Sequence, residues 1–290
     1  MKYPQYPKFS LKENRKSKYV IITASLGIAL LVVSTVFISA CQKKKEGSIS
    51  HAVEAWDSGD YQTAAEEYEH VLQSYPTGDQ ALEARFQLAN VYYYNLKKYE
   101  QARTHYKEFL NQSPAHANAA KARERLAEVL SELGRSYEAI AEYENLSPQS
   151  EKDRRRIRLR IADLYYEQKN YSQALTEYLK VTEQAEYDEL SEQAYLREAS
   201  IYHITRSQYK QAIPIYQMLA EETSDGKVRI RALYAIADCY AENLEIDQAI
   251  KTLRDIKDES EQTYISKRIT DFENRKREAA QARSAATQQR

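Results

Sequence analysis

Residues 59–76 read GDYQTAAEEYEHVLQSYP, and this stretch carries the pattern on which the fold depends. Ala64 and Tyr68 are four residues apart, so a helix presents both on one face, with a small residue beside an aromatic one. Pro76 stands twelve residues after Ala64, at a place where a proline can end a helix. The stretch therefore predicts a helix that packs closely against a neighbouring helix through its small residue.

The same pattern recurs along the chain. A small residue stands at Ala64, Ala102, Ala139, Ala174, Ala212 and Ala249, at intervals of 38, 37, 35, 38 and 37 residues. Four residues later come Tyr68, Tyr106, Tyr143, Tyr178, Tyr216 and Leu253, and twelve residues earlier come Ala52, Asn90, Ala127, Ala162, Ser200 and Ala237. This period indicates a repeated pair of helices that buries its apolar face by stacking on the next pair.

This arrangement resembles the tetratricopeptide repeat, a helix-turn-helix unit of about 34 residues. The resemblance implies an all-α fold, a right-handed superhelix (α-solenoid) of about six repeats with a carboxy-terminal capping helix. The repeats are placed at residues 45–78, 83–116, 120–153, 155–188, 193–226 and 230–263, followed by a capping helix and a disordered tail at 264–290. Most repeats lack the first-helix glycine and repeats three to six lack the terminal proline, which predicts less regular repeats there.

The units are longer than usual by one to four residues, which fall between one repeat and the next, as in YPTGDQALEARFQLANVYYYN at 75–95. This long form is similar to the BamD-like outer-membrane assembly lipoproteins and to the cell-division coordinator that works beside the Tol-Pal system. The match is best over residues 52–118. The insertion that BamD-like proteins carry after their second repeat is missing, and this chain has an additional repeat. The resemblance implies protein or peptide segments as partners, including components of outer-membrane barrel assembly.

The amino-terminal segment predicts export. Residues 1–19 hold six basic residues and one acidic residue, and residues 20–38 form an uncharged apolar run. The run ends in ISAC at 38–41, which resembles the bacterial lipobox. The resemblance implies a signal peptide at 1–40, acylation of Cys41 with palmitate, and a tether at 41–48.

Two membrane locations follow from this segment. A lipoprotein cleaved before Cys41 is expected on the periplasmic face of the outer membrane, because Gln42 stands where an Asp favours inner-membrane retention in such lipoproteins. An apolar run of 19 residues is also long enough to span a bilayer. The alternative is therefore a single-pass inner-membrane protein that assists chains leaving the export channel. Both interpretations place the repeats in the periplasm.

The composition argues against nucleic-acid binding and against catalysis. Residues 41–290 hold 36 basic and 42 acidic residues, a net charge of −6, whereas phosphate binding needs a clustered positive surface. The sequence has no Gly-rich phosphate loop, nucleophile elbow or Cys-x-x-Cys pair, and its five histidines are never at metal-ligand spacing. We therefore expect a non-catalytic interaction scaffold without catalytic residues, metal or cofactor, in which Cys239 is a buried core residue.

In this type of repeat the first helices line a concave groove that receives the partner. The residues predicted to contact the partner are Tyr94, Asn95, Glu124, Glu128, Glu132, Tyr166, Arg197 and Arg231. We expect the glutamates to receive a basic stretch of the partner, the tyrosines to supply contact area, and the two arginines to meet an acidic end. The alternative is a solvated charged face in which Arg123 and Arg125 offset the glutamates.

Overall fold

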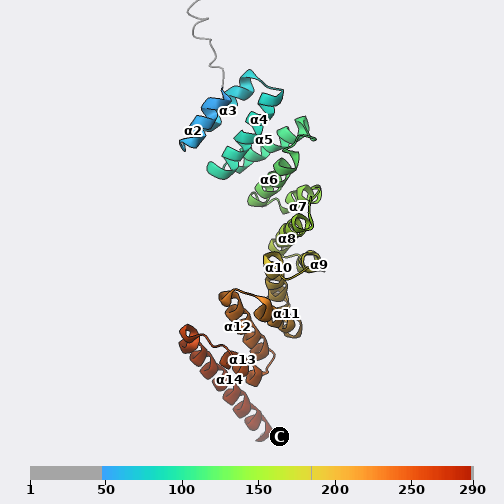
Figure 1. The fold of residues 1–290 in the computed structure, drawn as a ribbon. Helices are drawn as coiled ribbons and strands as arrows, with labels where there is room; N and C mark the ends of the chain where they lie inside the picture. The colour runs from blue at the N-terminus through green and yellow to red at the C-terminus, as the bar shows by residue number, and fades with distance from the viewer. Residues whose placement is uncertain (1–47, 184, 289–290) are drawn as a thin grey trace, which may run out of the picture. The chain divides into compact units, whose positions relative to one another are not determined.

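The computed structural model describes residues 48–183 and 185–288 (Figure 1). In these ranges the chain forms thirteen α-helices and no strand, which confirms the predicted all-α class. The predicted signal peptide at 1–40, Cys41 and nearly all of the tether lie outside the described residues. Within the described ranges, no helix is both long enough and apolar enough to cross a membrane. The described residues divide into two compact units, one up to Lys97 and one from Lys98.

The first unit holds the first helix pair and the helix that follows it. α2 (Ile49–Asp57) packs against α3 (Tyr61–Ser74), and α3 packs against α4 (Asp79–Asn90) and its π-helical continuation η1 (Val91–Asn95). Asp60 caps α3, since its carboxylate accepts a hydrogen bond from the Thr63 amide at 3.1 Å. This cap defines where α3, the second helix of the pair, begins.

The second unit continues the same helix-turn-helix order to the carboxy terminus. Its elements are α5 (Tyr99–Gln112), α6 (Ala119–Glu132), α7 (Ser136–Glu144), α8 (Glu151–Glu167), α9 (Tyr171–Thr182), α10 (Glu189–Ser200), η2 (Ile201–Thr205), α11 (Tyr209–Glu222), α12 (Gly226–Glu242), α13 (Ile246–Arg254), η3 (Glu259–Glu261) and α14 (Gln262–Gln288). From α5 onward each α-helix packs against the next one in the chain, and the first helices α8 and α10 also touch. Such sequential stacking is typical of a solenoid.

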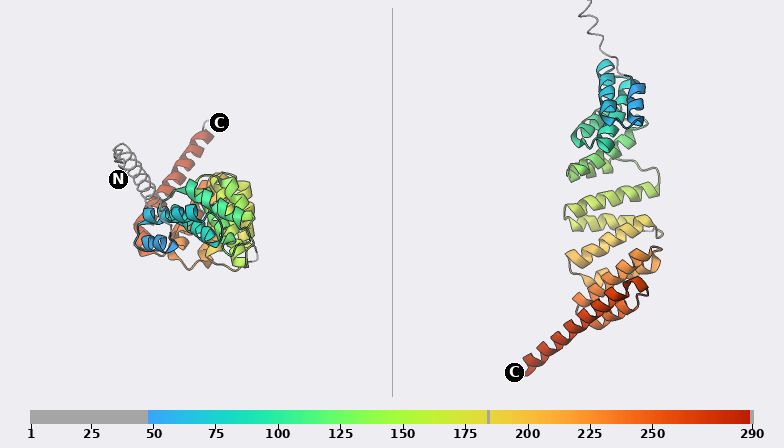
Figure 2. Two further views of the ribbon diagram at one scale, coloured as in Figure 1. Left: turned by 90° about the horizontal axis from the view of Figure 1, so that it is seen from above. Right: turned by 90° about the vertical axis from the view of Figure 1, so that its left-hand side faces the viewer.

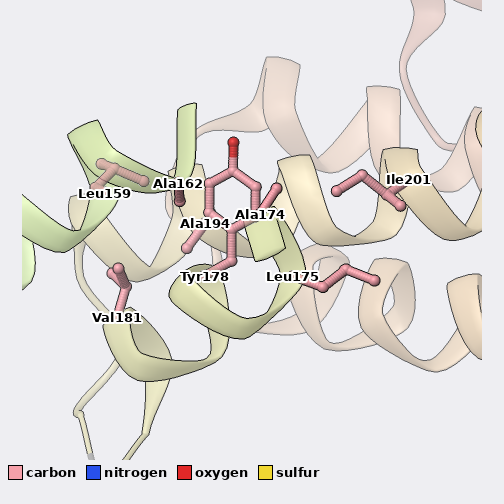
Figure 3. Packing of buried hydrophobic residues seen from close by; sticks show 8 residues of the cluster. All are labelled: Leu159, Ala162, Ala174, Leu175, Tyr178, Val181, Ala194 and Ile201. Atoms are coloured by element: carbon pink, nitrogen blue, oxygen red, sulfur yellow. The ribbon is translucent and has the colours of Figure 1, made fainter. Parts of the chain in front are cut away.

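The repeated small residues form the core of each helix pair. All six core alanines are fully buried, and the large residues four positions later are buried beside them. Figure 3 shows the fourth pair, in which the ring of Tyr178 lies among Ala162, Ala174 and Ala194 and its hydroxyl points out of the cluster. These three alanines come from α8, α9 and α10, so one aromatic ring joins three successive helices. The predicted packing of small residues against aromatic ones is confirmed.

Four of the first helices begin one turn earlier than the predicted repeat starts. The helical segments that begin at Asp79, Glu151, Glu189 and Gly226 each begin four residues before the predicted repeat, and each covers 17 residues when η1 and η2 are included. The extra residues of the long repeats are therefore helical. In the two repeats whose small first-helix residue is Asn90 or Ser200 instead of alanine, the last turn widens into the π-helices η1 and η2.

One residue in the left-handed backbone conformation joins the two helices of every pair. It stands five positions before the core alanine in each repeat, at Gly59, Lys97, Gly134, Lys169, Ser207 and Leu244, with φ between 50° and 82°. A non-glycine residue adopts this conformation at a cost of about 1–2 kcal/mol. Within the second unit, three of the four turn residues are not glycine, so the packing of the two helices imposes the turn there.

α14 covers the last helix pair. Ile265 and Phe272 of α14 are buried with Ile250 and Leu253 of α13, whereas the described side chains after Glu273 are exposed. Figure 2 shows the end of α14 projecting past this pair. The sequence predicted a disordered tail after the capping helix, but the structure continues the helix to Gln288. This polar end is rich in alanine, glutamine and arginine, which favour a helix even without tertiary contacts.

Candidate functional site

A cavity of about 720 Å³ lies among the first helices of the last three repeats. It is lined by Asp163 of α8, Gln193, Leu196, Arg197 and Ser200 of α10, His203 and Ile204 of η2, Tyr216 of α11, and Arg231, Tyr234, Ala235 and Asp238 of α12. Two predicted partner-contacting residues, Arg197 and Arg231, thus line one cavity from neighbouring repeats. The lining combines charged groups with aromatic rings.

Arg197 is held at the edge of this cavity by two contacts. Its Nε lies 3.6 Å from Asp163 Oδ1, and its guanidinium carbon lies 5.1 Å from the ring centre of Tyr166. The buried Tyr178 hydroxyl donates to Asp163 Oδ1 at 2.7 Å. Burial and the nearby Asp163 raise the pKa of the Tyr178 hydroxyl far above its ordinary value, so it remains a donor. Arg197, Tyr166 and Asp163 are therefore oriented before any ligand arrives.

The α12 side of the cavity carries a second ion pair and one arginine that has no ion pair in the described residues. Asp238 forms an ion pair with Arg268 of α14, and burial raises the pKa of Asp238 although Arg268 opposes this shift. Burial lowers the pKa of His203 although Asp238 and Glu242 oppose it, so the imidazole is neutral at neutral pH. Arg231 is exposed and has no ion pair within the described residues. The cavity thus offers one uncompensated positive charge.

The predicted glutamates lie on α6 and are largely compensated by arginines. Arg156 of α8 donates a hydrogen bond to Glu124, and Arg125 donates to both oxygens of Glu128 at 3.0 and 2.7 Å. Glu132 is exposed. The expectation that Arg123 offsets these glutamates is wrong in detail, because Arg123 instead forms an ion pair with Glu142 of α7 at 2.7 Å.

Tyr94 and Asn95, the remaining predicted contact residues, lie at the end of η1 in the first unit. The Tyr94 ring is exposed, and its centre lies 4.5 Å from that of Tyr93. Asn95 is half-buried. Tyr94 therefore presents an aromatic surface on the first unit.

The sequence prediction missed several residues of the cavity wall. Asp238 follows the small residue Ala237 as Asp163 follows Ala162, so the repeat frame held a signal for it. Tyr216 was identified as a core residue, yet it also borders the cavity and lies 6.1 Å from His203 between ring centres. No sequence signal singled out Gln193 or Tyr234, because their roles depend on how neighbouring repeats stack.

The described residues include one cysteine and several histidines. Cys239 is buried, and burial raises the pKa of its thiol to about 12, so it is a neutral core residue, as predicted. Among the described residues, no group of three His, Cys, Asp or Glu side chains has the arrangement of a metal site.

Family models match three parts of the chain. A model described as outer membrane lipoprotein matches residues 42–123, and two tetratricopeptide-repeat models match residues 125–189 and 231–261. None of the curated proteins compared with the chain matches it. A tetratricopeptide repeat protein from Parabacteroides merdae has a similar structure, with a TM-score of 0.52, 20% identity, and coverage of 71% of this chain and 76% of that one.

A second solved structure is the carboxy-terminal part of a repeat-containing protein from Cytophaga hutchinsonii, with a TM-score of 0.55, 16% identity, and coverage of 71% of this chain and 77% of that one. At such low identities the two structures establish the fold alone. The repeat models agree with the helix pairs and buried alanines described above. The described part of the chain therefore has the tetratricopeptide-repeat fold, with repeat models matching residues 125–189 and 231–261, and residues 42–123 are similar to an outer membrane lipoprotein family.

Proposed function

We propose that this protein is a non-catalytic, membrane-anchored scaffold of the periplasm. It binds segments of other proteins during outer-membrane protein assembly or envelope maintenance. The observation that carries the proposal is the cavity of about 720 Å³, which is lined by residues of three consecutive repeats and contains aromatic rings and an arginine without an ion pair in the described residues. The match of residues 42–123 to an outer membrane lipoprotein model supports the envelope setting.

The chemistry of the cavity favours a partner segment that carries an acidic group next to an apolar side chain. Arg231 meets the acidic group, and Arg197 can join it because its own carboxylate partner Asp163 also bonds Tyr178. The rings of Tyr216 and Tyr234 supply apolar contact area. The lining holds two arginines and two aspartates, so this preference rests on Arg231, which has no ion pair within the described residues.

The other predicted contact residues extend the same role beyond the cavity. We assign the exposed Glu132 to a basic side chain of the partner, and Tyr94 and Asn95 to contacts made by the first unit. Glu124 and Glu128 contribute only if the partner displaces Arg156 and Arg125. Changing Glu124, Glu128 and Glu132 together to Gln tests this assignment, and unchanged partner capture would remove α6 from the binding surface.

Site-specific crosslinking tests the cavity directly. A photoreactive amino acid in place of Gln193, inside the cavity, should give adducts with envelope proteins, and Arg231→Glu should abolish them. The same group in place of Thr176, an exposed position on the second helix α9, is the control. Equal adducts from both positions, or adducts that survive Arg231→Glu, would refute the assignment. Because Arg231 is exposed, its replacement should leave the melting midpoint unchanged.

We further assign the membrane anchor to Cys41. The outer membrane lipoprotein match begins at residue 42, directly after this cysteine, which supports cleavage at this point. The length of the apolar run at 20–38 favours the second candidate, an uncleaved inner-membrane protein that assists exported chains. Intact mass of the membrane-extracted protein separates them. Cleavage before Cys41 with added acyl chains supports the lipoprotein, and Cys41→Ser should then leave an uncleaved precursor without acyl label.

A further inference from the structure

Trp56 and Tyr166 occupy the same place in two different repeats. Each stands eight residues before the core alanine of its repeat, which is Ala64 for Trp56 and Ala174 for Tyr166. In the fourth repeat, the guanidinium carbon of Arg197 lies 5.1 Å from the centre of the Tyr166 ring. Arg197 belongs to α10, the first helix of the next repeat. One repeat therefore supplies the ring and the following repeat supplies the cation.

The first unit has the ring but not the cation. Arg197 stands fifteen residues before its core alanine, Ala212, and the residue at that place in the second repeat is Gln87. The neutral amide of Gln87 donates to Glu83 on its own helix at 2.8 Å. Within the described residues no arginine or lysine lies over the ring of Trp56, which is 48% exposed. Trp56 therefore lacks the cation that its counterpart in the fourth repeat has.

The charges near Trp56 are acidic. Asp57 follows it directly and is exposed, and Glu83 of the next first helix is half-buried. Burial, and then the carboxylates of Glu83 and Asp57, raise the pKa of the Tyr68 hydroxyl, so both carboxylates act on one core tyrosine of the first repeat. The described residues of the first unit, 48–97, hold eight acidic and two basic residues, a net charge of −6. Such a surface attracts a basic group.

We propose that Trp56 receives an arginine side chain of a bound protein segment, in the place that Arg197 takes on Tyr166. An indole ring attracts a cation more strongly than a phenol ring does, and Asp57 and Glu83 supply the compensating negative charge. Arginine suits this place better than lysine, because its planar guanidinium stacks on a ring and keeps its N–H groups for carboxylates. This inference rests on the proposed scaffold function and specifies which segment the first unit binds.

Val53 defines what stands beside that arginine. It is 41% exposed and lies three residues before Trp56, on the same face of α2. In the fourth repeat the corresponding residue is Asp163, whose Oδ1 lies 3.6 Å from Nε of Arg197. Valine offers contact to an apolar side chain instead of a charge. The bound segment therefore carries an apolar residue next to its arginine.

Gln87→Arg gives the first unit the internal arginine that the fourth ring already has. Because Trp56 is the single tryptophan of the chain, its fluorescence reports on the ring directly in the full-length protein in detergent. We expect acrylamide to quench Trp56 less in Gln87→Arg than in wild type, without any ligand. The matched control is Gln73→Arg, which adds the same charge at an exposed position of α3 and should leave the quenching unchanged.

The binding probe is a short capped peptide of alternating leucine and arginine. A second peptide with citrulline in place of arginine has the same shape without the charge. The arginine peptide should protect Trp56 of wild type from acrylamide, and the citrulline peptide should not. Gln87→Arg should weaken binding by about fivefold or more, because its own arginine occupies the ring, whereas Gln73→Arg should weaken it by less than about twofold.

Three results would overturn the proposal. Equal weakening by Gln87→Arg and Gln73→Arg would mean that only the overall negative charge attracts the peptide. Equal protection by the citrulline peptide would mean that the cation is not needed. Trp56→Ala gives an independent measurement, since Trp56 is exposed and its loss should leave the circular dichroism spectrum unchanged. Unchanged affinity of this variant for a fluorescein-labelled arginine peptide would mean that the ring is not the site.

This inference and the proposed function can fail separately. Crosslinking from Gln193 reports on the cavity of the second unit, and the peptide reports on Trp56. Absence of peptide binding, together with Gln193 adducts that depend on Arg231, would overturn the arginine site alone. Absence of the Gln193 adducts would count against the cavity and would leave the result for Trp56 standing.

Discussion

Arg155 connects three successive helices, and its replacement by methionine tests how strongly polar contacts fix the stacking of repeats. From α8, its Nε donates to the Val181 carbonyl of α9 at 2.7 Å. Its Nη1 and Nη2 donate to Asp188 at 2.8 and 2.7 Å. Asp188 is the N-cap of α10 and accepts the Ser191 amide at 2.9 Å. The side chain of Arg155 is 11% exposed and that of Asp188 is 40% exposed.

The exposure of Arg155 and Asp188 determines how much stability Arg155→Met should remove. An exposed ion pair contributes about 0–1 kcal/mol, and breaking a buried one costs about 3–5 kcal/mol. Since only Arg155 is buried, water screens the pair, and we expect Arg155→Met to lower the free energy of unfolding by about 2 kcal/mol. The methionine retains most of the apolar stem. In a double-mutant cycle with Asp188→Asn, the coupling energy should be about 1–2 kcal/mol.

The pH dependence gives a second measure of the same pair. The Arg155 guanidinium holds the pKa of Asp188 well below its usual range. Because the folded-state pKa is depressed, the stabilisation is present above the unfolded-state value near about 4 and is lost as the pH falls below it. Wild type should lose this increment on acidification, whereas Arg155→Met should lose only the smaller part that the Ser191 hydrogen bonds to Asp188 supply.

Urea denaturation measures the effect of Arg155→Met on the stability of the whole protein. Amide exchange over α8, α9 and α10 measures the effect on these helices alone. Both are needed because a solenoid need not unfold in one step. The control is Arg154→Met. Arg154 is 57% exposed and pairs with Glu151 on its own helix, so its loss should cost under about 0.5 kcal/mol. Equal denaturation curves for the two variants would show that the stacking does not depend on Arg155.

Three further predictions concern the core, the turns and one buried acid. Ala174→Arg places a charge at a fully buried contact and should lower the free energy of unfolding by more than about 3 kcal/mol. Thr176→Arg, on the exposed face of α9, should change it by no more than about 0.5 kcal/mol. Equal melting midpoints for the two variants would contradict the repeat frame. Gly134→Ala should lower the free energy of unfolding by about 1 kcal/mol in chemical denaturation, because its backbone is left-handed, although nothing lies within 4 Å of an added Cβ. Leu244→Gly should raise the free energy of unfolding, because Leu244 has the same backbone conformation. An unchanged stability of Gly134→Ala would show that this conformation costs nothing. Burial raises the pKa of Glu198 to about 7, so its contribution to stability is lost as the pH rises through that value, by about 3–4 kcal/mol at most. Glu198→Gln should remove this loss between about pH 5 and pH 8, and an unchanged pH profile would count against the raised pKa.

Much of the fold could be predicted because its determinants are local and repeated. The spacing of a small residue and an aromatic residue four positions later identifies one helix face, and six copies identify the stacking. The length of the first helices was missed, although Ser150, Asp188 and Asp225 stand in the sequence as N-caps of α8, α10 and α12. The standard repeat length obscured these capping signals. The end of α14 was missed because a polar helix without a core resembles a disordered tail.

The candidate site was predictable only in part. The repeat frame identified Arg197 and Arg231 because position within the first helix decides which face a residue occupies. The pairing of charges could not be predicted, since Arg156 reaches Glu124 from 32 residues away and depends on how adjacent repeats stack. Arg231 is a candidate contact because it has no ion pair in the described residues. A sequence pattern cannot show whether a charged residue has a partner.

The stacking of each helix on its neighbours has a consequence for cooperativity. In such an array each repeat can open with little help from distant ones, so stability varies along the chain. The cavity walls come from α8, α10, η2, α11 and α12, which belong to three repeats. A ligand held by both Arg197 and Arg231 would tie α10 to α12, and repeats that open separately would then open together. Occupancy would appear as slower amide exchange confined to these helices, even if no atom of the backbone moved.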